Sequence, residues 1–102
     1  MSYAVVWRQN HGRVYAGRLD FGDRSLELTG AALARHTNQL ALPYEDLGDV
    51  WVERRRPSRL AGLPTLGVDG TSGRLRIGSL QGAGVLHELA ERLQERAAAA
   101  AV

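Results

Sequence analysis

The histidines of this 102-residue chain are the first residues to test for chemistry, because the sequence contains no cysteine. The segment from His87 to Glu91 (HELAE) begins like the helical motif in which two histidines one turn apart bind zinc. Its second ligand position is Glu91 and no histidine follows, so this kind of zinc site is not expected. His11 and His36 fall in an expected turn and an expected loop, and the spacing does not gather them with His87. We therefore predict no metal site.

Other catalytic motifs fail at identifiable positions. Gly82 and Gly84 stand where a dinucleotide-binding fingerprint would begin, but His87 occupies the position of its third glycine. The chain has no lysine, which excludes the lysine-dependent phosphate-binding loop. No Gly-x-Ser-x-Gly sequence surrounds Ser25, Ser58, Ser72 or Ser79. We predict a non-enzymatic protein that uses no cofactor.

Arginine supplies all 13 basic side chains, and four of these lie in one short polar segment expected to connect two strands. The candidate contacts for a partner or an anion are these four and two in the first expected hairpin: Arg54, Arg55, Arg56, Arg59, Arg8 and Arg13. At about 1 kcal/mol for each charge near an anionic membrane, the four supply roughly 4 kcal/mol, comparable to a millimolar dissociation constant. Nucleic acid is an unlikely partner, since the same few charges give weak, salt-dependent binding. The alternative is a solvated connection with intramolecular partners such as Glu53.

Composition places the chain among ordinary globular domains. Hydrophobic residues make up 44% and charged residues 24%, and 11 acidic residues leave a net charge of only +2. The length predicts one domain, which we assign to residues 1–96, followed at 97–102 by an alanine-rich tail able to extend a helix. The N-terminus lacks the basic region of a signal peptide, and no apolar run is long enough to cross a bilayer. We predict a cytoplasmic protein.

Alternation of apolar and polar residues predicts about seven β-strands, which must position these side chains. Leu26 and Leu28, for example, share an inward face, and Pro43 indicates an edge strand or a bulge. We expect residues 30–39 to form a loop with at most one helical turn. The expected strands are 3–9, 13–21, 25–29, 39–44, 47–54, 64–69 and 74–79.

After residue 79 the apolar period changes from two to 3.6, which predicts an amphipathic C-terminal helix. Leu86, Leu89 and Leu93 lie on its buried face, His87 lies off that face, and Ser79 is expected to cap the helix start. Strands followed by one helix leave no βαβ unit, so the sheet should be antiparallel. The expected fold class is α+β, mainly β.

The segment from Leu42 to Val50 (LPYEDLGDV) is similar to an "apolar, x, Tyr, x, Asp, Ile or Leu, x, x, Val" segment of bacterial pleckstrin-homology-like (PH-like) domains. With the order of strands and helix, nearly the whole chain resembles the PH-like and GRAM-like families. The resemblance implies a PH-like barrel of about seven antiparallel strands closed by one C-terminal α-helix. Independently of any family, Asp46 can bend the chain between two strands, and Tyr44 should pack in the core.

The basic pattern of lipid-binding PH domains across the first hairpin is only partly present. Arg8, His11 and Arg13 fit it, but Tyr15 stands where that pattern has arginine. The resemblance therefore does not extend to the phosphoinositide site of those domains. We predict an interaction module that binds a protein partner or a second copy of itself, and the alternative is a peripheral anionic-lipid-binding domain that uses the Arg-rich loop.

Overall fold

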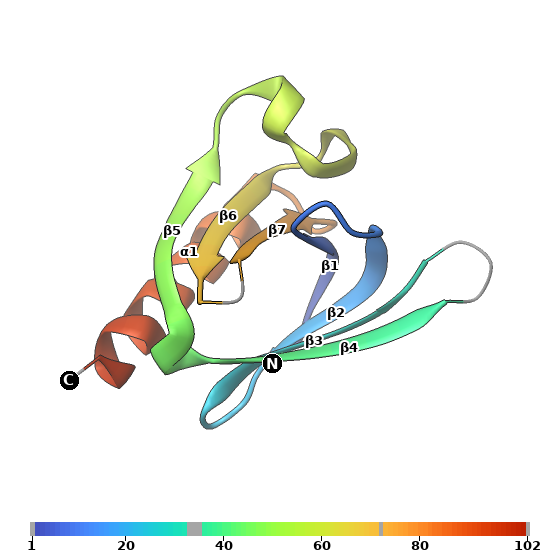
Figure 1. Cartoon of the computed structure of the whole chain (residues 1–102). Coiled ribbons are helices and arrows are strands. Elements are labelled where there is room, and N and C mark those ends of the chain that lie inside the picture. Colours follow the sequence, from blue (N-terminus) through green and yellow to red (C-terminus); the bar gives the residue numbers. More distant parts are fainter. Residues whose placement is uncertain (1, 33–35, 72, 102) are drawn as a thin grey trace.

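Seven antiparallel strands and one C-terminal helix form the structure, a computed structural model that describes residues 2–32, 36–71 and 73–101. The strands pair in the order β4-β3-β2-β1-β7-β6-β5 and curl into a half-barrel (Figure 1). This confirms the predicted mainly β fold with antiparallel strands and a terminal helix. The elements are β1 Ser2–Gln9, β2 Tyr15–Phe21, β3 Ser25–Ala31, β4 Thr37–Pro43, η2 Tyr44–Asp46, β5 Leu47–Glu53, η3 Arg56–Ser58, η4 Leu60–Gly62, β6 Thr65–Gly70, β7 Gly73–Ser79 and α1 Ala83–Ala100.

The central strand β1 joins the two halves of the curled sheet. It pairs with β2 on one side and with β7 on the other, so that Trp7 lies opposite both Tyr15 and Ile77. Trp7 is fully buried, its ring stacks on Tyr15 with the centroids 4.7 Å apart, and its Nε1 donates to the Thr29 carbonyl oxygen at 3.1 Å. Tyr15 thus packs against the core.

The helix α1 covers the concave side of β5 to β7 and completes the core. Leu86, Leu89 and Leu93 are almost fully buried, as their spacing predicts, while His87 is exposed. Inner-face residues of all seven strands meet them, which gives one contiguous apolar cluster. The alanine-rich tail continues the helix as far as Ala100.

The prediction of a loop at residues 30–39 is wrong at both of its ends. The β3 strand continues through Ala31 and β4 begins at Thr37, and these two residues lie opposite each other in the ladder. Pairing between the strands overrides the helix propensity of the alanine-rich segment, because a ladder satisfies the backbone groups that a single helical turn leaves unpaired. The expected helical turn lies partly at residues 33–35, outside the described residues.

The predicted helix cap is also wrong. Ser79 is the last residue of β7, and its Oγ accepts a hydrogen bond from the backbone N–H of Gln81 at 3.1 Å. The helix begins at Ala83, and its N-cap is Gly82, with φ of 97° and no side-chain cap. Ser79 therefore supports the turn between strand and helix rather than the helix start.

Candidate functional site

The strand β4 is an edge of the sheet with no strand beyond it in the described part of the chain. It pairs only with β3, from Ala31 opposite Thr37 to Ser25 opposite Pro43, and lies at the lower right of Figure 1. Such an edge presents a row of backbone N–H and C=O groups to any additional strand. Pro43, at the end of β4, fits the predicted edge position.

The opposite edge, β5, is covered. The helix α1 runs beside it, and Nε2 of Gln94 donates to the Val50 carbonyl oxygen at 3.2 Å. The ladder between β5 and β6 is also irregular between Leu47 and Val50. A bulge and a covering helix are two ways in which proteins block edge pairing, so β4 is the more accessible edge.

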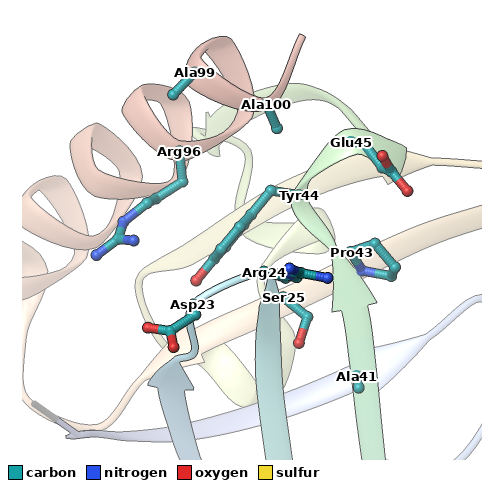
Figure 2. A pocket seen from close by; sticks show the side chains of 10 residues that line it. All are labelled: Asp23, Arg24, Ser25, Ala41, Pro43, Tyr44, Glu45, Arg96, Ala99 and Ala100. Carbon is teal, nitrogen blue, oxygen red and sulfur yellow. The ribbon is translucent and has the colours of Figure 1, made fainter.

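A groove of about 790 Å³, which we call the Tyr44 groove, opens at the end of β4. It lies between the β2–β3 turn, the β4–η2 corner and the last turns of α1 (Figure 2). The elements that meet here are far apart in sequence and are brought together by the packing of α1 on the sheet. The lining residues are Asp23, Arg24, Ser25, Ala41, Pro43, Tyr44, Glu45, Arg96, Ala99 and Ala100.

Tyr44 forms the inner wall of this groove. Its hydroxyl donates to the Gly22 carbonyl oxygen at 2.7 Å, and the Arg96 guanidinium carbon lies 5.7 Å from its ring centroid. Figure 2 shows the Arg96 side chain beside the ring. Burial raises the pKa of the Tyr44 hydroxyl above its ordinary value of 10.0, and the Arg96 charge opposes that rise. The predicted core packing of Tyr44 is confirmed.

The charges around the Tyr44 groove balance each other. Asp23 and Glu45 contribute two carboxylates, and Arg24 and Arg96 contribute two guanidinium groups. A surface of this kind has no strong preference for an anion or a cation. It is better suited to the mixed polar and small apolar surface of a polypeptide.

The Arg-rich segment is an exposed connection between β5 and β6 that contains η3, at the top of Figure 1. Its four arginines, Arg54, Arg55, Arg56 and Arg59, are all exposed. The ion pairs found among the described residues involve none of them. The expected partner Glu53 accepts a hydrogen bond from Trp51 Nε1 at 2.9 Å instead.

The remaining two candidate arginines lie on different parts of the first hairpin. Arg8 is half-buried on the convex outer face of β1, and Arg13 is exposed in the turn before β2. Arg8 lines a second groove together with Arg74 and Arg76, and that groove contains no other candidate arginine. Arg74 and Arg76 were not predicted, although their alternation with Leu75 and Ile77 already placed them on an outward face.

The described residues contain no group of three or more His, Asp or Glu side chains that could hold a metal ion. His11, His36 and His87 are all exposed, in the β1–β2 turn, before β4 and on α1 respectively. None of the helices described is both long enough and apolar enough to cross a bilayer.

No protein-family model, curated protein or solved structure matches this chain. Its function must therefore be inferred from the two grooves, the free edge of β4 and the arginines.

Proposed function

We propose that this chain is a non-enzymatic interaction module with a PH-like fold, which binds an extended protein segment as an additional strand on β4. The observation that carries the proposal is the contrast between the two sheet edges. The β4 edge has no neighbour among the described residues, whereas α1 and Gln94 cover β5. The segment belongs to a partner protein or to a second copy of this chain.

The arrangement of elements supports the PH-like part of the proposal. The resemblance of the Leu42 to Val50 segment implies about seven antiparallel strands followed by one C-terminal helix, and the chain has seven such strands and one such helix. In that segment Leu47 and Val50 pack toward the core, and the 3₁₀ turn η2 makes the bend expected around Asp46.

The Tyr44 groove supplies what a strand-binding edge needs for specificity. In strand addition, main-chain hydrogen bonds provide affinity and side-chain pockets provide selectivity. Ala41 and Pro43 belong to both β4 and the groove, so a segment paired with β4 passes directly over it. The balanced charges of the groove favour a polar, weakly charged segment over a strongly acidic or basic one.

The test uses a charged side chain on the edge and a matched substitution away from it. Ala41→Lys places a charge at an exposed position of the edge strand β4. Ala16→Lys places the same charge at an exposed position of β2, a strand with neighbours on both sides. Sedimentation velocity of the chain alone measures self-pairing, and a displayed library of extended peptides probes other segments. We expect association with one of these probes, reduced about ten-fold or more by Ala41→Lys and little changed by Ala16→Lys. Absence of both kinds of association, or equal effects of the two variants, would refute the proposal.

Binding to an anionic lipid surface remains the second candidate, because the four arginines of the β5–β6 connection are exposed and take part in none of the ion pairs described. We expect weak binding to phosphatidylserine vesicles that falls with added salt and is lost when all four arginines are changed to glutamine. The measurement is co-sedimentation with vesicles. Equal recovery on neutral and anionic vesicles at low salt would exclude this function.

A further inference from the structure

Four residues from four neighbouring strands lie in one row across the convex outer face of the sheet. Arg8 of β1 is opposite Arg76 of β7, Arg76 is opposite Gly67 of β6, and Gly67 is opposite Trp51 of β5. Their neighbours along each strand face the core, so these four face outward. We call this set the Arg8–Trp51 row.

Arg8 and Arg76, the two arginines of the row, repel each other in the absence of an anion. Like charges directly opposite each other on adjacent strands destabilise a sheet. The ion pairs described involve neither Arg8 nor Arg76. The Nε atoms of both side chains are buried and have no hydrogen-bond partner among the described residues. Buried donors without acceptors are uncommon and costly. An anion placed between the two guanidinium groups would offset the repulsion between their charges and accept hydrogen bonds from their terminal nitrogen atoms.

A groove of about 460 Å³ lies next to this pair and adds a third guanidinium group. Arg74 lines it, with its Nε 3.0 Å from Oδ1 of Asp69, so one carboxylate is already used by one arginine. Arg8 and Arg76 therefore contribute the uncompensated positive charge of the groove. His11 also lines it.

Backbone contacts hold the walls of this groove in place. The N–H of Asn10 donates to the Arg74 carbonyl oxygen at 2.7 Å, and the Asn10 Oδ1 accepts from the Arg74 N–H at 3.0 Å. Asn10 adopts a left-handed conformation with φ of 53°, which asparagine tolerates better than most residues. The β1–β2 turn is thereby fixed to the start of β7, and a ligand would meet a largely pre-formed site.

We propose that the groove at Arg8 and Arg76 binds a phosphate monoester group. A phosphate dianion can offset both charges and accept hydrogen bonds from both guanidinium forks, whereas a single carboxylate can offset only one charge. The indole ring of Trp51, with the Arg74 guanidinium carbon 5.2 Å from its centroid, gives the rest of such a ligand an apolar surface beside the site. This site goes beyond the proposed strand binding, because β1, β2 and β3 separate β7 from β4.

The phosphate has two sources to distinguish, a soluble phosphorylated molecule and a lipid headgroup. Pyrophosphate serves as the soluble probe, because each of its terminal phosphate groups presents three charged oxygens as a phosphate monoester does, and binding is observed by NMR through the Nε–Hε signals of the arginines. Vesicles of phosphatidic acid present a phosphate monoester, and vesicles of phosphatidylserine present negative charge without one. Arg8→Gln and Arg76→Gln remove one guanidinium each, and Arg18→Gln is the matched control on the same outer face, where Arg18 pairs with Asp20 at 3.0 Å.

We expect pyrophosphate to shift the Arg8 and Arg76 signals, and each of the two groove variants to weaken its binding about ten-fold or more. Arg18→Gln should change the affinity less than about two-fold, in line with a screened surface charge. Thermal unfolding gives an independent measure: pyrophosphate should raise the midpoint of the wild type and of Arg18→Gln, and should raise that of Arg76→Gln clearly less at the same concentration. Because both arginines are only half-buried, the variants should fold.

Binding of pyrophosphate identifies a soluble ligand, and binding of phosphatidic acid vesicles alone identifies a headgroup. Absence of pyrophosphate binding together with no preference for phosphatidic acid over phosphatidylserine vesicles, or equal weakening by Arg18→Gln and Arg76→Gln, would overturn the proposal. Failure of this site would leave the β4 edge untouched, since Ala41→Lys and Arg76→Gln lie on separate strands and are measured with different probes.

Discussion

The contact between Trp51 and Gly67 shows how a glycine holds a tryptophan ring in place on the outer face of the sheet. The indole ring lies where a Cβ on Gly67 would be, so any side chain at residue 67 would overlap Cε2 and Cζ2 of the ring. In this position Trp51 Nε1 reaches Glu53, and the ring meets Arg74. Glycine at residue 67 is therefore a requirement of packing, and it keeps the tryptophan flat beside the arginines.

We expect Gly67→Ala to lower the free energy of unfolding by about 1–3 kcal/mol, because the added methyl group forces the indole ring out of its place. Urea unfolding monitored by circular dichroism measures the loss. Gly84→Ala is the matched control: a Cβ there meets open space near the start of α1, and alanine favours the helix, so this variant should be neutral or slightly stabilising.

A double-mutant cycle isolates the contact. In a Trp51→Ala background, Gly67→Ala should cost less than about 0.5 kcal/mol, since no ring remains to be displaced. An equal cost in both backgrounds would show that backbone conformation, and not the indole ring, requires glycine.

At the scale of elements, periodicity predicted the strands and the helix well because each buries one face. The clear alternation of Leu26 and Leu28 in β3 and the helical spacing of the leucines in α1 are confirmed by their burial. The extension of β3 and β4 into residues 30–39 could not be predicted in this way. Small and polar residues such as Gly30 and Asn38 have no apolar pattern, and only their pairing with each other makes them strand residues.

The candidate sites also differ in whether their residues are close together in the chain or meet only in the fold. The Arg-rich connection is visible in the sequence because its four arginines are close together in the chain. The pair of Arg8 and Arg76 is not visible, since it depends on β1 and β7 being neighbours in the sheet. The Tyr44 groove depends likewise on the packing of α1 near η2. Non-local pairing decides which side chains meet, and the order of residues along the chain does not encode it directly.

At the scale of the whole molecule, alkaline pH provides a test of the packing between the helix and the sheet. The chain contains no lysine and no cysteine, and arginine keeps its charge up to very high pH. Tyrosines are therefore the side chains that titrate in this range. Tyr3 and Tyr44 are both nearly fully buried in the core cluster that α1 completes. Burial raises the pKa of each above its ordinary value of 10.0, and the helix charges Arg92 and Arg96 oppose the rise at Tyr3 and Tyr44 respectively.

These raised pKa values predict a loss of stability at high pH. Below about pH 10 both the folded and the unfolded chain keep the two tyrosine protons, so the contribution of these groups does not change. Above that pH the unfolded chain releases the protons first, and the free energy of unfolding falls as the pH rises toward the higher pKa values of the folded state. Urea unfolding at a series of pH values, with tyrosinate absorbance followed in parallel, measures the fall.

The double variant Tyr3→Phe and Tyr44→Phe is the control. Its stability should decline clearly less steeply with pH. It also loses the hydrogen bond from Tyr44 to Gly22, so it should be less stable at neutral pH. A decline of the same steepness in the double variant would mean that other groups, and not these two buried hydroxyls, limit the stability of the molecule in alkali.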